Sequence, residues 1–418
     1  MEVLVLGAGV IGLTTAYYLN TAGHDVMVVD GHPEVAQDTS YANGAQLSYS
    51  YVAPLAGPGV LTKIPGWLLG RDAPMRFRPS LDPDQWRWCL QFALACTRGQ
   101  SARSTRQLLE LSFLSRSLMH ALIKDEPTLR FDYVRSGKLV LHRDAQAFAS
   151  AVEQLEFQRT LGCDQQALDR HACLTLEPAL EHIHEEIAGG IYTASDDTAD
   201  CYGFCKGLER LLRERGVTFE LGVEVSALKR AGTDRVEAWT QAHRLPGEQI
   251  VVALGCASPT LLKPVGIDVP LYPLKGYSLT VKVAPAGAAP FISVTDFARK
   301  IVYARLGNRL RVAGMADIVG YSRAVNPTRI ATLRRESQAL FPHAGDYTAA
   351  EEWAGLRPAT PRGTPVVGPT PLKNLWLNLG QGALGFTLAT GCAQLLSDWI
   401  GNRPASIDRA MFSLGRRA

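Results

Sequence analysis

Three glycines near the N-terminus have the spacing of a turn that binds a dinucleotide. Gly7, Gly9 and Gly12 form a Gly-x-Gly-x-x-Gly motif directly after the apolar run 3–6. The first glycine permits a tight turn, the second lets the backbone approach a pyrophosphate, and the third lets a helix pack closely on the strand. The helix N-terminus adds unpaired N–H groups and a positive dipole end. The residues assigned to this cradle are Gly7, Ala8, Gly9, Val10, Ile11 and Gly12.

A second apolar run, 26–29, ends at Asp30. A carboxylate at the end of this strand can accept hydrogen bonds from ribose hydroxyl groups. It favours an adenosine with a free 2′-hydroxyl, which means NAD or FAD rather than NADP. Strand, turn, helix, strand and acid follow in order, so the sequence predicts a Rossmann-like unit.

Another glycine-rich helix start lies at the opposite end of the chain. The strand-like run 375–379 leads into Gly380-Gln-Gly-Ala-Leu-Gly385-Phe-Thr387. A cofactor that contacts both glycine-rich turns has to be long, which suits FAD. An enzyme that uses a nicotinamide cofactor is therefore disfavoured. This turn would direct N–H groups at the isoalloxazine ring, where negative charge accumulates on reduction; the alternative is a packed turn before a buried helix. The residues assigned here are Gly380, Gln381, Gly382, Leu384, Gly385 and Thr387.

Further segments are expected to line the cofactor. Loop 38–51 is rich in small and hydrogen-bonding residues, which is typical of contact with a ligand. Strands are predicted at 223–228 and at 249–255, and the latter ends at a glycine turn where backbone can pass a cofactor. The residues assigned from these segments are Ser40, Asn43, Gly44, Ala45, Val225, Ala253 and Gly255.

The elements between these segments alternate helices with strands. Apolar residues at helical spacing predict helices at 84–97, 104–124 and 144–161. Alternating residues predict strands at 277–283, 300–305 and 309–314, within an antiparallel sheet that has one face toward solvent or a ligand. The predicted fold class is therefore α/β combined with α+β.

Composition limits the classes of protein that remain. The chain has 418 residues, which suits two connected domains, and 46% hydrophobic with 20% charged residues is ordinary for a globular protein. A formal net charge of +3 gives no indication of nucleic-acid binding. No apolar run is long enough to span a bilayer, and the first ten residues already form a core strand rather than a signal peptide. The expected location is the cytoplasm or the cytoplasmic face of a membrane.

The eight cysteines form no Cys-x-x-Cys pair. Their scatter fits neither a zinc ribbon nor an iron–sulfur loop, and no histidine spacing suggests a metal site. They are expected to be buried thiols in a reducing compartment. A thioether link to flavin has no local signature, so non-covalent FAD is expected over covalent FAD.

Four longer motifs point to a known family. They are 53–59, 269–280, 311–320 and the run Gly355-Leu-Arg-Pro-Ala-Thr-Pro-Arg-Gly-Thr-Pro-Val-Val-Gly368. With the glycine turn, they make the chain similar over its whole length to the FAD-dependent D-amino acid dehydrogenases of small-subunit type. This group lies within the D-amino acid, glycine and sarcosine oxidases.

The resemblance implies a Rossmann-like FAD-binding domain and a discontinuous substrate domain around a mixed or antiparallel sheet. The FAD domain would comprise 1–85, 186–265 and 355–418, and the substrate domain 86–185 and 266–354. The implied reaction is oxidation of a D-amino acid by hydride transfer from Cα to flavin N5. The imino acid then hydrolyses to a 2-oxo acid and ammonia, and the electrons pass to a quinone or a dye.

Arg357 lies in Gly-Leu-Arg-Pro, where related amine oxidases keep an arginine that binds the substrate carboxylate. A planar, permanently charged, bidentate donor suits that task. The alternative is a structural arginine that caps carbonyl groups or pairs with Glu351 or Glu352. No general base is assigned, since water can take the proton of the substrate ammonium group.

Three tyrosines and a glutamine are further site candidates. Tyr277 and Tyr303 lie on predicted strands of the substrate sheet, and Tyr51 ends the loop after Asp30; a phenol can donate to a carboxylate while its ring forms an apolar wall. The alternative is a half-buried aromatic residue on a strand. Gln46 falls where some relatives carry a residue above the flavin.

Some positions depart from the family pattern. Ser48-Tyr-Ser-Tyr51 replaces a Ser-Pro-Gly-Tyr-like run, Gln381 stands where His is common, and Phe386 where Trp is common. These positions leave the substrate range and the electron acceptor open. The predicted pocket sheet is apolar and aromatic, which favours neutral or apolar D-amino acids.

Segment 64–78 is the candidate for peripheral membrane contact. It combines apolar and basic side chains, namely Trp67, Leu68, Leu69, Arg71, Arg76 and Arg78. Such a patch can dock on an anionic lipid surface near a quinone pool. Alternatively, Trp67 and its neighbours cover the substrate domain.

The alternatives to a D-amino acid dehydrogenase belong to several classes. An oxidase that uses O₂ would act on glycine, sarcosine or cyclic imino acids such as D-proline. A hydroxy-acid dehydrogenase of the same fold would release no ammonia. A non-catalytic FAD-binding protein would show no flavin bleaching with any amino acid.

Overall fold

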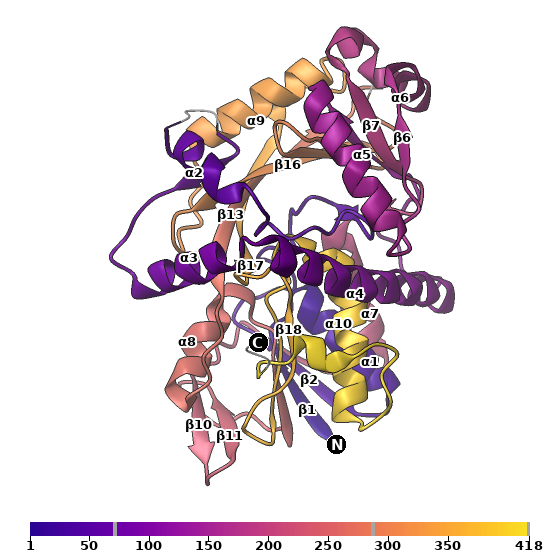
Figure 1. Ribbon diagram of the computed structural model, residues 1–418. Helices are drawn as coiled ribbons and strands as arrows, with labels where there is room; N and C mark the ends of the chain where they lie inside the picture. The colour runs from indigo at the N-terminus through magenta and orange to yellow at the C-terminus, as the bar shows by residue number, and fades with distance from the viewer. Residues whose placement is uncertain (70–72, 286–288, 416–418) are drawn as a thin grey trace.

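A computed structural model of the chain describes residues 1–69, 73–285 and 289–415. The molecule has two lobes, each built on a large sheet (Figure 1). The lower lobe in Figure 1 contains β1, α1 and α10, and we call it the nucleotide lobe. The upper lobe contains β13, β16 and α9, and we call it the sheet lobe.

The nucleotide lobe contains a six-stranded sheet in the order β18-β19-β12-β1-β2-β9. All neighbouring strands run parallel except β18, which is antiparallel to β19. The central strand is buried on both faces: Val3 and Val5 join one core, and Leu4 and Leu6 the other. This is the pattern of a strand inside a parallel sheet that has both faces covered. The bounds are β1 Glu2–Leu6, β2 Asp25–Asp30, β9 Thr218–Leu221, β12 Gln249–Val252, β18 Val366–Pro369 and β19 Leu375–Leu379.

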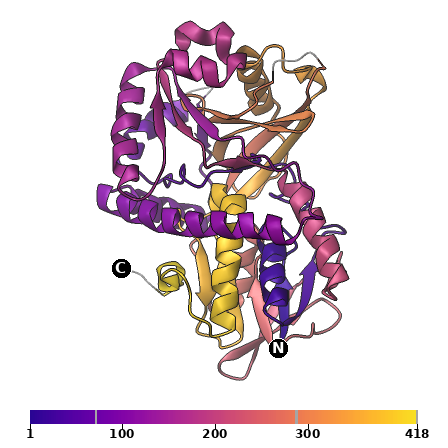
Figure 2. The ribbon, with the colours of Figure 1, turned by 90° about the vertical axis from the view of Figure 1, so that its right-hand side faces the viewer.

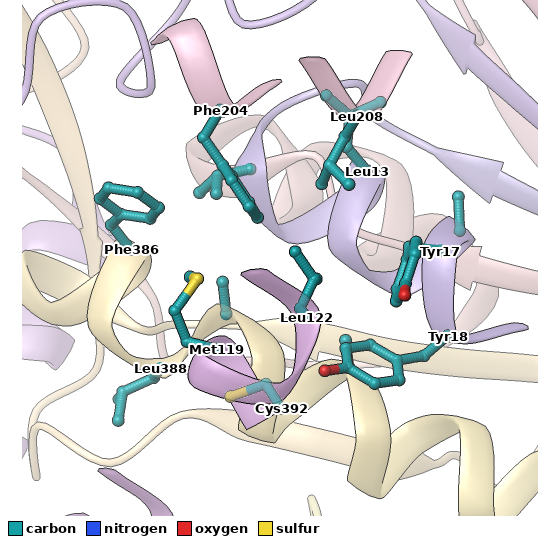
Figure 3. Packing of buried hydrophobic residues seen from close by; sticks show 14 of the residues in the cluster. Leu13, Tyr17, Tyr18, Met119, Leu122, Phe204, Leu208, Phe386, Leu388 and Cys392 are labelled. Atoms are coloured by element: carbon teal, nitrogen blue, oxygen red, sulfur yellow. The ribbon is translucent and has the colours of Figure 1, made fainter. Parts of the chain in front are cut away.

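Four helices share the core on one face of this sheet. They are α1 Val10–Thr21, α4 Arg98–Asp125, α7 Cys201–Glu214 and α10 Gly385–Ile400. Figure 2 shows the long α4 crossing α10, and a hydrogen bond of 2.8 Å joins Ser115 Oγ to Thr390 Oγ1 between them. Figure 3 shows their side chains packed together, among them Leu13, Tyr17, Met119, Leu122, Phe204, Leu208, Leu388 and Cys392.

The sheet lobe is built on nine strands in the order β17-β13-β16-β15-β14-β5-β7-β6, with β4 paired to β16. The sheet is mixed, because β14 runs parallel to β5 and β16 parallel to β4. One face carries a core with α9, and α5 covers β5 and β7 on the other. The bounds are β4 Met75–Phe77, β5 Lys138–His142, β6 Gln166–Leu168, β7 Gly189–Thr193, β13 Tyr272–Lys282, β14 Ser293–Asp296, β15 Ile301–Leu306, β16 Arg309–Ile318, β17 Glu351–Ala359, α5 Ala145–Arg159 and α9 Pro327–Leu340.

The borders between the two lobes differ from the expected domain boundaries. β4 and β7 fall in segments expected in the FAD domain, yet they pair into the nine-stranded sheet. β17 crosses the expected border at 355, because it pairs with β13 along its whole length. α4 was expected in the substrate domain but packs on α10. Local patterns identify a strand or a helix, whereas its partner is decided by register and by contacts distant in the sequence.

The remaining elements are short. Two ribbons pair β3 with β8 and β10 with β11, and β10 begins four residues later than the strand predicted at 223. Among the described residues, no helix has the length and the apolar character needed to cross a bilayer. The bounds are β3 Gln46–Leu47, β8 Asp197–Thr198, β10 Ala227–Ala231, β11 Arg235–Trp239, α2 Val60–Leu69, α3 Pro83–Ala95, α6 Arg170–Leu176 and α8 Ser258–Leu262.

Candidate functional site

A cavity of about 1740 Å³ lies between the two lobes. One wall is formed where β1, β2 and β12 end, at Gly7, Asp30 and Ala253. The other wall includes Gly276 of β13 and Ala313 of β16 in the sheet lobe. The carboxyl ends of parallel strands are where open α/β sheets bind ligands. The volume exceeds the roughly 300–1,000 Å³ of an ordinary small-molecule pocket, so there is room for a dinucleotide and a further molecule.

The glycine turn leaves no space for side chains. Gly7 has φ +112°, and a Cβ there would lie 2.6 Å from the Ala253 carbonyl oxygen. A Cβ on Gly12 would lie 1.8 Å from the Gly7 carbonyl oxygen. The first turn of α1 therefore packs directly on the turn, as the sequence motif predicts.

Asp30 is oriented by contacts on both of its oxygens. Oδ2 accepts a hydrogen bond of 2.7 Å from the Ala8 N–H, and Oδ1 accepts one of 2.9 Å from the His32 N–H. The His32 ring Nδ1 also lies 2.8 Å from Oδ1. At the start of α1, the Val10 N–H donates to Ser40 Oγ at 3.0 Å. The carboxylate thus borders the cavity in a fixed position.

The C-terminal turn presents the start of α10 to the same cavity. Gly380 and Gly382 have φ of +79° and +57°, and α10 begins at Gly385 without a capping side chain. Gly385 and Thr387 border the cavity, and Thr387 Oγ1 accepts a hydrogen bond of 3.1 Å from the Ser48 N–H. An uncapped helix start has unpaired N–H groups that can bind an anion.

Most of the expected cofactor residues border this cavity. Ala8, Gly12 and Gly380 lie behind its wall, where they shape the two turns. The residues on the wall are Gly7, Gly9, Val10, Ile11, Asp30, Ser40, Asn43, Gly44, Ala45, Val225, Ala253, Gly255, Gln381, Gly382, Leu384, Gly385 and Thr387.

Arg357 extends from β17 across the neighbouring strand. Its guanidinium group lies over Gly276, where a Cβ would come too close to it, and Nη1 donates to the Met315 carbonyl oxygen at 2.8 Å. Burial lowers the pKa of Arg357, while the charge of Asp317 opposes that shift. Among the described residues no carboxylate forms an ion pair with Arg357. Of the two structural alternatives, the carbonyl contact is present at Met315, whereas the carboxylates are engaged elsewhere: Glu351 with Tyr41 at 3.2 Å and Glu352 with Arg334 at 2.7 Å.

A β-bulge places the Met315 carbonyl group. Lys275 pairs with Asp317 and Tyr277 with Gly314, so Gly276 alone faces two residues of β16. Met315 has φ +65°, which is strained for a residue with a side chain. Bulges redirect groups beside functional sites, and here the redirected carbonyl oxygen accepts from Arg357.

The structure does not bring both strand tyrosines to the cavity. Tyr303 is fully buried in the core that contains α9, with its ring 5.1 Å from that of Phe341. Tyr277 borders the cavity, but its hydroxyl group donates to Asp317 Oδ2 at 3.0 Å and its ring packs in the same core. Asp317 is in turn paired with the buried Arg329 of α9. The phenol of Tyr277 therefore has a structural partner.

Tyr51 and Gln46 meet at a lysine that the sequence analysis did not assign. Lys138 Nζ donates to Gln46 Oε1 at 2.9 Å and to Ser48 Oγ at 2.8 Å, and lies 4.4 Å from the centre of the Tyr51 ring. All four residues border the cavity. Burial lowers the pKa of Lys138 to about 8, while the charge of Asp196 opposes that shift.

Sequence patterns carried only weak signals for the unassigned residues. Lys138 and His142 are polar residues at alternate positions of the strand Lys-Leu-Val-Leu-His, which places them on one face. Asp196 belongs to no recognisable sequence motif, yet it is buried beside Lys138. Burial raises the pKa of the Asp196 carboxyl group to about 6, and the charge of Lys138 opposes this rise. The backbone conformation of Met315 is determined by the β-bulge, which no sequence pattern indicated.

A family model described as FAD dependent oxidoreductase matches residues 2–399. A D-amino acid dehydrogenase 2 of Ralstonia nicotianae is 52% identical over 426 residues and covers 100% of both chains. One from Pseudomonas aeruginosa is 46% identical over 408 residues and covers 97% of this chain and 96% of its own. A D-amino acid dehydrogenase of Rhizobium johnstonii is 41% identical over 417 residues, with 100% of both covered.

Solved structures share the fold at low sequence identity. A glycine oxidase from Geobacillus kaustophilus has a TM-score of 0.79 with 22% identity, and covers 100% of this chain and 98% of its own. An L-proline dehydrogenase from P. horikoshii has a TM-score of 0.77 with 14% identity, and covers 99% of this chain and 96% of its own. The expected combination of a Rossmann-like unit with a sheet domain is confirmed.

Proposed function

The chain belongs to the family of FAD-dependent oxidoreductases, and on this premise we propose that it is a D-amino acid dehydrogenase that produces 2-oxo acids and ammonia. Relatives of that name match its full length at 41–52% identity. The observation that carries the proposal is the guanidinium group of Arg357. It is half-buried, borders the cavity and forms no ion pair within the described ranges 1–69, 73–285 and 289–415. A substrate carboxylate would supply the negative charge that pairs with the guanidinium group.

The residues at both ends of the cavity fit FAD. Gly7 permits the tight turn, Gly9 leaves room for a pyrophosphate at the start of α1, and Asp30 is oriented for a ribose. The uncapped start of α10 provides N–H groups for the pyrimidine edge of the flavin. When bound, FAD supplies a two-electron acceptor at N5.

We expect FAD to be held without a covalent bond. All eight cysteines are free, and Cys256 borders the cavity. Burial raises the pKa of the Cys256 thiol to about 12, which keeps it protonated and weakly nucleophilic. Acid precipitation of the protein is expected to leave the flavin in the supernatant.

Arg357 would bind and orient the substrate. Its planar fork can donate two parallel hydrogen bonds to the 2-carboxylate, which fixes the position of the Cα–H bond. The Met315 carbonyl oxygen holds one side of the guanidinium group. Tyr51 and Gln46 line the same cavity around Lys138, and we propose them as further walls of the substrate site.

Gly276→Ala should impair substrate binding while FAD remains bound. The added Cβ would lie within 2.7 Å of three guanidinium atoms of Arg357, so the guanidinium group must move away from the Met315 carbonyl oxygen. We expect kcat/KM for D-amino acids to fall about 100-fold, because the bidentate geometry is lost. Gly99→Ala is the matched control, since nothing lies within 4 Å of a Cβ there. Unchanged steady-state kinetics in Gly276→Ala would contradict this position for Arg357.

The proposed electron acceptor is a quinone. The alternative of an oxidase acting on glycine, sarcosine or D-proline is disfavoured, because the glycine oxidase structures resemble this chain at only 19–22% identity. Peripheral contact with a membrane through segment 64–78 stays a prediction, as does a location at the cytoplasmic face. Residues 70–72, including Arg71, and the side chains of Trp67, Leu68 and Leu69 lie outside the described residues.

Anaerobic mixing with D- and L-amino acids tests the proposed function. D-enantiomers are expected to bleach the flavin absorbance near 450 nm, and ammonia should appear in proportion to the electrons transferred. Readmission of air then distinguishes a dehydrogenase, whose flavin reoxidises slowly and so releases peroxide slowly, from an oxidase, whose flavin reoxidises fast with one peroxide for each reduced flavin. A protein that holds FAD but is bleached by no amino acid would refute the proposal.

A further inference from the structure

The loop that begins with β3 borders the cavity and contacts both lobes. In the nucleotide lobe, the Ser48 N–H donates to Thr387 Oγ1 in the first turn of α10 at 3.1 Å. In the sheet lobe, Gln46 Nε2 donates to Ser293 Oγ of β14. Gln46, Ser48 and Tyr51 border the cavity, and we call their side chains the loop wall. A change in the position of this loop would therefore change the shape of the cavity.

Lys138 of β5 contacts all three side chains of the loop wall. Its Nζ atom donates to Gln46 Oε1 at 2.9 Å and to Ser48 Oγ at 2.8 Å, and it lies 4.4 Å from the centre of the Tyr51 ring. A charged ammonium group strengthens the two hydrogen bonds and is attracted by the face of the ring. Because Lys138 is only 2% exposed, a ligand in the cavity would meet the loop wall rather than the ammonium group.

Asp196 holds the backbone of the same loop. Its Oδ1 atom accepts hydrogen bonds from the Tyr49 N–H at 2.8 Å and from the Ser50 N–H at 3.3 Å. Asp196 is buried as well, and its charge and that of Lys138 each favour the ionised form of the other. Two buried groups of opposite charge thus hold this loop, the carboxylate at its backbone and the ammonium group at its side chains.

An apolar residue at position 138 would fill the same space at a lower cost in stability. The next three residues of β5 are apolar and buried. Transfer of an ammonium group out of water is costly, and a buried ion pair is often no more stabilising than apolar residues of similar volume. The contribution that is specific to lysine is therefore the set of contacts with its polar and aromatic neighbours.

We propose that Lys138 is a positioning residue of the substrate site, whose ammonium group fixes Gln46, Ser48 and Tyr51 as the wall against which the substrate side chain packs. The inference rests on the proposed function, and Lys138 acts on the substrate only through the loop wall. All three contacts depend on one nitrogen atom, so replacement of the lysine removes them together.

The loop wall lies away from the carboxylate site. Leu139 shares a row of the sheet with Val312 of β16, three strands or about 14 Å away. Met315, which contacts Arg357, lies three residues or about 10 Å further along β16. A substrate held at Arg357 therefore approaches the loop wall with the end of its side chain. The effect of Lys138 on binding should grow with the length of that chain.

Lys138→Met, with Lys282→Met as the matched control, tests this position. Acetate and hexanoate are suitable ligands, because both carry a carboxylate and neither has an amino group that titrates. Their dissociation constants can be measured from the change in the flavin absorbance of the holoenzyme. In Lys138→Met, we expect hexanoate to bind about tenfold more weakly and acetate to stay within twofold. Lys282 is exposed at the end of β13, so its variant should bind both acids like the wild type.

A double variant separates positioning from charge compensation. Lys138→Met leaves the buried Asp196 carboxylate without its cation, which destabilises the fold. Lys138→Met with Asp196→Asn removes both charges, and the asparagine Oδ1 can still accept from the two loop N–H groups. The thermal midpoint of the double variant should recover toward that of the wild type, whereas its hexanoate affinity should stay low. Recovery of both would show that Lys138 only compensates the charge of Asp196, and would overturn the inference.

The pH dependence of hexanoate binding gives a second test. Burial lowers the pKa of Lys138 to about 8, so its ammonium group loses its proton above that pH. The titratable groups beside it are Asp196 and Tyr51, whose pKa values burial raises to about 6 and about 12, so neither changes its charge between pH 7 and 9.5. Over this range, the wild type should bind hexanoate progressively more weakly and acetate about equally well. The same decline in Lys138→Met would assign it to another group and contradict the inference.

The two acids also distinguish this inference from the proposed function. Unchanged hexanoate binding in Lys138→Met, with acetate still bound, would overturn the role of Lys138 and leave the proposed function intact. An equal loss for both acids would mean that Lys138 supports the whole site rather than the loop wall, which also contradicts the inference. Failure of the wild-type holoenzyme to bind acetate would instead refute the proposed carboxylate site at Arg357, and this inference with it.

Discussion

Replacing Arg357 with methionine is expected to lower kcat/KM for D-amino acids by about a thousandfold, which corresponds to roughly 4 kcal/mol. Methionine removes both the charge and the fork of donors from a half-buried position on the cavity wall, where we propose that they bind the substrate carboxylate. The loss should appear mainly in KM and in the rate of anaerobic flavin bleaching. The FAD absorbance of the purified variant should remain, because Arg357 donates its hydrogen bond to the Met315 carbonyl oxygen and not to a residue proposed to bind the cofactor.

Two companion variants separate charge from geometry. Arg357→Lys keeps the positive charge but replaces the fork with a point donor, so we expect a fall of about 100-fold. Arg362→Met removes an exposed arginine from the turn after β17 and should leave kcat/KM within twofold. A substrate carboxylate bound elsewhere would be indicated if Arg357→Met behaved like Arg362→Met.

The glycine turn and the strand that ends at Asp30 could be predicted from the sequence because their constraints are local. The turn requires glycine at positions 7 and 12, since a Cβ at either would meet backbone atoms. The acid at position 30 ends a strand that pairs with β1 residue by residue. Spacing along the chain therefore translates directly into position in space.

The residues of the sheet lobe that line the cavity were harder to predict, because the sequence does not show which face of the sheet lines the cavity and which face packs in the core. Alternation groups Tyr277 with Leu279 and Val281 on one face of β13, and the three pack in one core. Both faces of this strand are buried, so apolar character does not distinguish the cavity face from the core face. Tyr303 was assigned to the site on the same pattern, and it lies in the α9 core.

The geometry around Arg357 depends on contacts that no local pattern contains. The bulge opposite Gly276 arises from the pairing of β13 with β16, which are distant in the sequence. Lys138 comes to Gln46 from a strand 92 residues away. From the sequence alone, a lysine on a strand is predicted to face solvent. Its burial becomes known only from the tertiary structure.

Gly12→Ala is expected to yield a protein that retains less than a tenth of the wild-type FAD and unfolds more easily, by about 2 kcal/mol. The added Cβ would lie 1.8 Å from the Gly7 carbonyl oxygen, and the obstacle is backbone, because the Gly7 N–H donates to the Val29 carbonyl oxygen at 2.8 Å. α1 must therefore move away from β1. That shift displaces the helix N-terminus from the pyrophosphate and opens the core that α1 shares with α10. The flavin-to-protein absorbance ratio and the thermal midpoint of the apoprotein measure the two effects separately.

Gly99→Ala serves as the control for this prediction as well, because it makes the same chemical change in the first turn of another helix. The gain in intrinsic helix propensity is similar at both positions, roughly 0.5–1 kcal/mol. Nothing lies within 4 Å of a Cβ on Gly99, so only the propensity acts there and FAD content should not change. The difference in FAD content and stability between the two variants then measures the effect of the steric clash at Gly12 alone. Full FAD content in Gly12→Ala would mean that the helix can retreat without losing the cofactor, and that Gly12 is not required for close packing.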